Sequence, residues 1–336
     1  MNAAELPNRR VEAWKYTDLR AAMGGVGASV SEHVVARATP AASPIEALAR
    51  AGAQQERFLA IEAGQTHELV HGAMPTAAGQ VARVSVPAQQ GGVLIERFVG
   101  GQVFSAGLTS IDLAEAARLT RIVIQEGGAS AAPGDQLRDV ALSEARIRLA
   151  AGASFRQFVL AEGAKLARIE THVVVEGEGG EVELNGVYLA GAGRHADLTS
   201  VVTHAAGGGE TRQLIKGVAR KGGRGVFQGR IEVAHGAQKT DARQYHHGVL
   251  LEDGAEIFAK PELMIHADDV QCAHGNTAGG LDETALFYMR ARGVPEHEAR
   301  ALLIEAFLAD AIPDHLPGEI RGDLLARIRR WLGGGS

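Results

Sequence analysis

The stretch Ile265–Gly280 reads IHADDVQCAHGNTAGG, and it lies where one sequence pattern ends and another begins. Before it, from about residue 140, short apolar segments alternate with polar residues and are separated by glycines. After it, apolar residues recur every three or four positions, which is typical of amphipathic helices. The sequence therefore predicts a mainly β fold that gives way to helices near residue 280.

The alternating segments have a period close to two. Val173 and Val175 flank a single residue. Ile231 and Val233 do the same, and the residue between them is the charged Glu232. Side chains two apart in a strand point to the same face, so this pattern predicts half-buried strands. Glycines between the segments supply the backbone conformations that tight turns need.

No helical pattern interrupts these strands, which argues against a doubly wound α/β sheet. A β-sandwich, a closed barrel and a solenoid remain, and the uneven glycine spacing does not single out a strict repeat. Between residues 58 and 125 the segments FLAIEAG, VARVSVP and RIVIQEGG predict further strands, and Ile111–Arg118 is interpreted as one or two helical turns.

Helices are predicted at both ends of the chain. We expect an N-terminal helical region over residues 1–60, a β core over 61–280 and a C-terminal helical domain over 281–336. Asp282 is a good N-cap, Gly293 is placed to end the first helix, and Pro295 suits the first position of the next. Two apolar stripes are predicted in the C-terminal domain: Ala299, Leu302, Leu303, Ala306 and Phe307 on one helix, and Ile320, Leu324, Leu325, Ile328 and Leu332 on the last.

Composition narrows the class of protein. The 336 residues carry a formal net charge of −6, which argues against nucleic acid as the main partner. A single cysteine excludes an internal disulfide and is consistent with a reducing compartment. The sequence has no run of about 18 apolar residues and no apolar signal-peptide core near Met1. We expect a soluble cytoplasmic protein that does not contact a membrane.

Cys272 and His274 are the candidate metal ligands. In an extended strand their thiolate and imidazole would face the same side, yet two ligands do not complete a tetrahedral site. The C-x-H spacing matches no standard zinc motif, so the alternative is a small buried cysteine with no ligand role. Asp268 and Asp269 could supplement the pair, but carboxylates near a turn are more often solvated or capping groups.

The remaining histidines are interpreted as surface residues. His195, His204 and His235 lie beside glycine turns, whereas His246 and His247 are adjacent and should point to opposite faces of a strand.

Catalytic and nucleotide-binding motifs are absent from the sequence. It has no G-x-S-x-G elbow, no P-loop, no G-x-G-x-x-G between strand and helix and no HEXXH. We therefore predict that the chain is not an enzyme and binds no nucleotide. Lys260–Leu263 (KPEL) is interpreted as structural, with Pro261 expected to mark a bend between coils.

The C-terminal part of the sequence resembles the SufB/SufD family of iron–sulfur cluster assembly proteins. The motifs KPEL, ADDV, C-x-HG, LDE-x-ALFY and RG-x-P-x-x-EAR-x-LLI occur in the family's order and spacing, and EAWKYT near the start is similar to a segment of that family. The resemblance implies a right-handed parallel β-helix core. It also implies a SUF-system scaffold subunit in a SufBCD-like complex, in which a SufB-like paralogue pairs with the chain and a SufC-like ATPase docks on it.

The resemblance further implies roles for individual residues. A transient iron–sulfur cluster, or iron, would be shared with the partner subunit, with His274 the favoured ligand and Cys272 the second. One cysteine distinguishes the chain from the SufB pattern and cannot hold a four-thiolate cluster alone. The ATPase would dock on about Asp282–Ile312, through Asp282, Leu286, Arg290, Pro295, Glu298, Arg300 and Leu303. A homodimer of the isolated chain is left open, and the alternatives are a homo-oligomeric metal-binding β-helix protein and a β-helical polysaccharide lyase.

Overall fold

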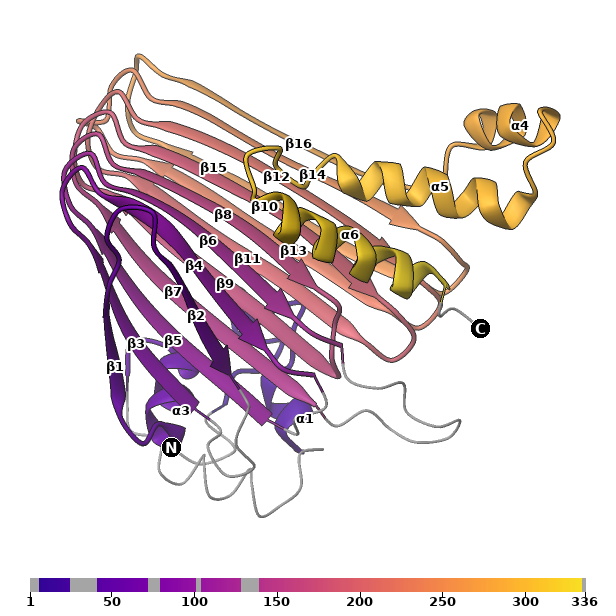
Figure 1. The fold of residues 1–336 in the computed structure, drawn as a ribbon, viewed down its shortest axis with the longest axis horizontal. Helices are drawn as coiled ribbons and strands as arrows, with labels where there is room; N and C mark the ends of the chain where they lie inside the picture. The colour runs from indigo at the N-terminus through magenta and orange to yellow at the C-terminus, as the bar shows by residue number, and fades with distance from the viewer. Residues whose placement is uncertain (1–5, 25–40, 72–78, 101–103, 128–138, 334–336) are drawn as a thin grey trace.

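The computed structural model describes residues 6–24, 41–71, 79–100, 104–127 and 139–333. Sixteen strands in these ranges wind into a solenoid whose two eight-stranded sheets are parallel throughout (Figure 1). The parallel β-helix predicted from the family resemblance is confirmed.

Successive strands alternate between the two sheets. The odd sheet contains β1 (Glu56–Ala60), β3 (Gly79–Val86), β5 (Phe104–Leu113), β7 (Val140–Leu149), β9 (Leu166–Val175), β11 (His195–His204), β13 (Arg224–Val233) and β15 (Glu256–Ile265). The even sheet contains β2 (Thr66–His71), β4 (Gly91–Phe98), β6 (Arg118–Gln125), β8 (Ser154–Ala161), β10 (Glu181–Ala190), β12 (Glu210–Ala219), β14 (Asp241–Leu250) and β16 (Gln271–Gly279).

The solenoid interior is filled by columns of stacked side chains. In the odd sheet, Val173, Val202, Ile231 and Leu263 are successive register partners, and the first three are at most 1% exposed. Burying one such side chain contributes roughly 1.5–3 kcal/mol. The period-two pattern in the sequence therefore corresponds to one inward and one outward residue in alternation.

Helices cover the outer faces of both sheets. The N-terminal η2 (Glu12–Trp14), α1 (Leu19–Gly24) and α3 (Pro44–Gly52) pack on the odd sheet around Trp14, which is 3% exposed. The C-terminal α6 (Gly318–Gly333) packs on the even sheet through Leu324 and Ile328, with Ile320, Leu325 and Leu332 beside them. The predicted apolar face of the last helix is confirmed.

The remaining C-terminal helices are α4 (Glu283–Ala291) and α5 (Glu296–Ala309). Asp282 caps α4 as predicted, since its Oδ1 accepts from the backbone N–H groups of Thr284 and Ala285. The predicted stripe on α5 is only partly correct. Ala299, Ile304 and Leu308 are its buried residues, whereas Leu302 is 52% exposed. The helix is apolar on more than one side, so periodicity alone did not show which side faces the sheet.

Two further predictions about local structure are wrong. Ile111–Arg118 contains no helix: β5 continues to Leu113 and β6 begins at Arg118, with a turn at Ala116 (φ 54°) between them. The sheet ladder overrides the helix preference of Leu113 to Ala117. Pro261 marks no bend and lies in the middle of β15, the edge strand of the odd sheet.

The position of Pro261 is explained by the hydrogen-bonding direction of β15. The N–H groups of Glu256 and His266 donate to carbonyls next to or on β13, so even-numbered residues of β15 face that neighbour. Odd-numbered residues direct their N–H positions toward the open edge. Pro261 therefore lacks an N–H where no ladder partner exists, as is usual for proline in sheets.

Two histidines predicted to lie on the surface are in fact buried. His204 and His246 both have 0% exposure, because each points into the solenoid interior. His247, the neighbour of His246, points outward and contacts Thr277 (Nδ1···Oγ1 2.7 Å), so the predicted division of this pair between two faces is confirmed. No helix within the described ranges is long and apolar enough to cross a membrane.

Candidate metal site at the open end of the solenoid

The last coil of the solenoid, formed by β15 and β16, has no further coil of the described residues stacked on it. Each strand is the edge of its sheet. In β13 most residues are buried, whereas every residue of β15 and β16 is partly or fully exposed, with Met264 at 42% and Ile265 at 43%. The inner faces of these two strands, which would be interior in any earlier coil, form an uncovered surface that we call the open end.

Cys272 lies on the inner face of β16. It is the register partner of Ala242, which is fully buried, and it packs against the edge of the main hydrophobic core. Burial raises the pKa of the Cys272 thiol, and the nearby Asp241 carboxylate acts in the same direction. The thiol therefore keeps its proton unless a metal ion binds the sulfur and displaces the proton.

His274 lies two residues further along the same face of β16, and its register partner is the fully buried Gln244. The His274 side chain is exposed and makes no side-chain hydrogen bond within the described part of the chain. The predicted common orientation of Cys272 and His274 thus follows from the β16 ladder, with one soft sulfur and one imidazole at the open end.

The structure does not add the two aspartates to this pair. Asp269 forms an ion pair with Lys239 in the neighbouring turn, and Asp268 is exposed. Among the described residues no three His, Cys, Asp or Glu side chains converge into a metal site. The arrangement can therefore supply two donor atoms of a coordination sphere, and the described residues add no third one beside them.

A polar residue next to His274 on the inner face was not identified from the sequence. Asn276 follows on the same face, and its Oδ1 lies 2.6 Å from Nδ1 of His246. Nε2 of His246 lies 2.9 Å from the Tyr188 hydroxyl, and burial lowers the pKa of His246 to about 4. A polar chain thus leads from the interior to Asn276. The signal that could have found it is the 30-residue separation between His246 and Asn276, which is one coil.

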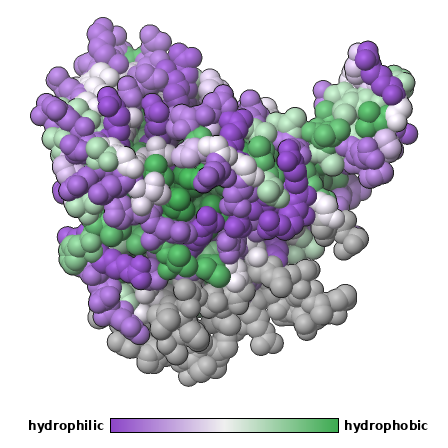
Figure 2. All heavy atoms as spheres, viewed as in Figure 1, coloured by the Kyte–Doolittle hydropathy of each residue, from purple (hydrophilic) through white to green (hydrophobic). Residues whose placement is uncertain are grey.

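Helices α4 and α5 carry a second exposed surface. Phe287 is 72% exposed, Tyr288 57% and Leu302 52%. Figure 1 shows α4 projecting away from the solenoid, and Figure 2 shows hydrophobic surface on this projection. We call these three side chains the apolar patch. Isolated exposed apolar residues are common, but three large ones on adjacent helices are typical of a protein contact.

The residues that were predicted to bind the ATPase have varied environments on these helices. Leu286 is 3% exposed, Arg290 pairs with Glu296 at 3.3 Å, and Arg300 contacts the Leu251 carbonyl at 3.5 Å. Asp282 and Pro295 begin the two helices, Glu298 is exposed and Leu303 is half-buried. The members of the apolar patch were not among the predicted residues, although they lie between them in sequence.

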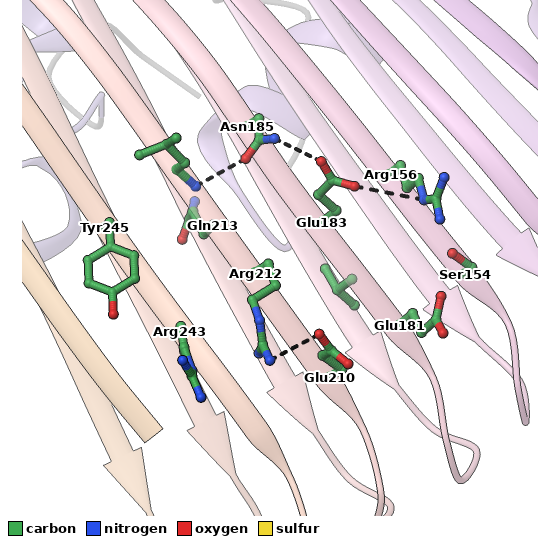
Figure 3. Close-up of a pocket in the computed structure, with 12 residues that line it drawn as sticks. Ser154, Arg156, Glu181, Glu183, Asn185, Glu210, Arg212, Gln213, Arg243 and Tyr245 are labelled. Atoms are coloured by element: carbon green, nitrogen blue, oxygen red, sulfur yellow. Dashed lines mark hydrogen bonds and ion pairs between the residues drawn. The ribbon is translucent and has the colours of Figure 1, made fainter. Parts of the chain in front are cut away.

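A groove of about 440 Å³ crosses the outer face of the even sheet (Figure 3). Its charges pair with one another: Arg156 on β8 lies 3.8 Å from Glu183 on β10, and Arg212 lies 3.0 Å from Glu210 on the same strand, β12. This mutual neutralisation in an open, hydrated groove gives it no net preference for an anion or a cation, so we assign it no ligand.

Comparison with known proteins places these features in context. The family model described as "SUF system FeS cluster assembly, SufBD core domain" matches residues 70–307. The iron–sulfur cluster assembly protein SufD of Escherichia coli is 34% identical over 174 residues, which are 52% of this chain and 41% of that protein. SufD of Bacillus subtilis is 31% identical over 182 residues, 49% of this chain and 41% of that protein. The chloroplastic protein ABCI7 of Arabidopsis thaliana is 30% identical over 257 residues, 74% of this chain and 52% of that protein. The chain thus spans about half, or less, of the length of these relatives.

Proposed function

This chain belongs to the SufBD family of the SUF iron–sulfur cluster assembly system and is SufD-like within it, and from that premise we propose that it is a non-catalytic scaffold subunit of a SufBCD-like complex. The observation that carries the proposal is the open end, where the Cys272 sulfur and the His274 imidazole share one face of an uncovered coil.

A SufB-like paralogue covers the open end in this proposal. Edge strands with unpaired backbone groups and half-exposed apolar side chains, such as Met264 and Ile265, are stabilised by pairing with another chain. A second β-helix of the same width would extend both sheets and bury the inner faces of β15 and β16. A paralogue therefore suits this surface better than an unrelated globular partner does.

The cluster, or the iron from which it is built, is cargo held between the two subunits. His274 offers an imidazole nitrogen and Cys272 a sulfur, and the paralogue supplies the remaining ligands. Binding releases the Cys272 proton, since burial favours the neutral thiol in the free chain. Weak retention by one subunit alone suits a scaffold that must pass its cargo on.

A SufC-like ATPase docks on α4 and α5. The apolar patch supplies anchors of the kind that dominate protein interfaces, and Glu298 with the ion-paired Arg290 and Glu296 supplies a polar rim. Replacing Phe287 by Asp should weaken capture of the ATPase by about 2 kcal/mol or more. Phe58→Asp is the matched control, because Phe58 is equally exposed at 72% but lies on β1 at the opposite end of the solenoid.

The test of the scaffold role is anaerobic co-purification followed by iron and sulfide quantitation. The wild-type chain should co-purify with the paralogue and the ATPase, and His274→Ala should abolish cluster formation while leaving the complex intact. His67→Ala is the control, since His67 lies in the same register column at the other end of the even sheet. Wild-type cluster yield in His274→Ala would remove this histidine from the site.

The alternative of a homo-oligomeric metal-binding protein is decided by elemental analysis of the isolated chain. Stoichiometric iron or zinc on the purified protein without partners would favour it over the scaffold role.

A further inference from the structure

Polar side chains occupy one interior column of the even sheet. Its members from β6 to β16 are Arg121, Gln157, Leu184, Gln213, Gln244 and His274, each the register partner of the next. The four polar members before His274 are at most 6% exposed. The column thus ends at the imidazole that the proposed function assigns to the cargo.

Hydrogen bonds orient the amide next to His274 in the structure. Nε2 of Gln213 donates to Oγ of Ser200 at 2.8 Å, and the Gln213 carbonyl oxygen accepts from Nε2 of Gln244, also at 2.8 Å. With Gln213 in this orientation, reversing the Gln244 amide alone would place two carbonyl oxygens against each other, so the N–H side of Gln244 lies toward Gln213.

This orientation leaves the carbonyl oxygen of Gln244 without a partner. The side chain has 0% exposure, and its Oε1 is buried without a hydrogen bond among the described residues. A buried acceptor with no partner costs roughly 1–3 kcal/mol, and such atoms in native proteins call for an explanation. Adjacent strands lie about 4.8 Å apart, so the imidazole of His274, stacked one strand further along, can reach this oxygen.

We propose that Gln244 is a positioning residue for His274. Its Oε1 accepts a hydrogen bond from one ring N–H of His274, which fixes the tautomer and directs the other, unprotonated nitrogen out of the open end toward the cargo. Metal-binding histidines are usually oriented in this way by an acceptor behind the ring. The inference rests on the proposed ligand role of His274 and adds the residue that prepares it.

The direct test is the tautomer of His274, read from the ring nitrogens by NMR of the full-length chain labelled with ¹⁵N-histidine at pH 8. His274→Gln identifies the signals. We expect one dominant neutral tautomer in the wild-type protein, a mixture in Gln244→Met, which keeps the volume but lacks the acceptor, and a single tautomer again in Gln244→Glu. A mixed tautomer in the wild-type protein, or a single one that survives in Gln244→Met, overturns the proposal. The wild-type measurement stands even if a variant fails to fold.

Metal binding provides an independent readout. With Co²⁺ as the probe, Gln244→Met should bind about 10–100-fold more weakly than the wild-type chain. Gln228→Met should bind normally, because that 8% exposed glutamine faces outward on the odd sheet. Equal Co²⁺ affinity of wild type and Gln244→Met contradicts the positioning role. If His274→Ala binds Co²⁺ as well as wild type does, the ligand role fails, and the tautomer experiment still decides what Gln244 does.

Discussion

Replacing Arg121 by Leu should destabilise the solenoid strongly, because it leaves a carboxylate alone in the interior. Arg121 and Glu96 form an ion pair at 0% and 1% side-chain exposure. Glu96 also accepts from the Thr109 hydroxyl at 2.6 Å and lies 3.1 Å from Nε2 of His71. No solvent can replace the guanidinium once it is removed.

The magnitude follows from the burial of the pair. Breaking a buried ion pair by removing one partner costs about 3–5 kcal/mol. Burial would raise the pKa of Glu96, yet Arg121 and His71 lower it from 4.5 to about 2, so the carboxylate stays ionised in the interior because of these two partners. Arg121→Leu combined with Glu96→Leu should recover most of the loss, since no charge is then left buried.

The effect also has a defined pH dependence. A carboxyl group whose folded pKa is lowered stabilises the fold above its unfolded pKa, and this contribution is lost as pH falls from about 4.5 toward 2. Below that range the wild-type protein loses the benefit of the pair, and Arg121→Leu no longer contains a buried charge.

The assay is urea denaturation followed by circular dichroism at pH 7 and at pH 3. The gap in unfolding free energy between wild type and Arg121→Leu should be about 3 kcal/mol or more at pH 7 and smaller at pH 3. A gap below about 1 kcal/mol at pH 7, or one of equal size at both pH values, would refute the reasoning.

Three further predictions concern packing. Gly217→Ala should lower the free energy of unfolding by about 1–3 kcal/mol, seen as a lower melting temperature, because the new Cβ would lie 1.9 Å from Cζ of the Tyr188 ring. Gly236 has open space around it, so Gly236→Ala should change the free energy of unfolding by less than about 0.5 kcal/mol. Similar losses in both variants would contradict this account. Trp14→Ala should cost about 3–5 kcal/mol and speed hydrogen exchange in residues 6–23, and unchanged exchange there would show that Trp14 does not anchor the segment. Leu324→Ala should cost about 2–5 kcal/mol in thermal unfolding, since this side chain is fully buried between α6 and the even sheet, and a loss below 1 kcal/mol would contradict the packing described.

The strands were predictable because their inward and outward residues alternate locally. Val173 and Val175, for example, both lie inside, as their spacing indicates. The coil itself was not visible in local patterns, because pairing joins residues about 30 positions apart through turns of unequal length. The family resemblance, rather than periodicity, distinguished a solenoid from a sandwich.

The same distinction applies to the candidate site. The C-x-H spacing was enough to place Cys272 and His274 on one face, since that depends only on strand geometry. Gln244 could not be connected with them without the register between β14 and β16. His204 lies beside a glycine turn, which suggested a surface position, whereas its place in the alternation of β11 directs it inward.

Pro261 gives the terminal coil two unlike borders. A foreign strand that aligned with β15 would find no amide hydrogen at the centre of that border, whereas β16 presents no proline. Open-ended solenoids risk stacking copy upon copy into fibres, and an interrupted border on one sheet disfavours such indiscriminate growth. Pro261 therefore makes β15 a poorer template than β16 for pairing with the strand of another molecule.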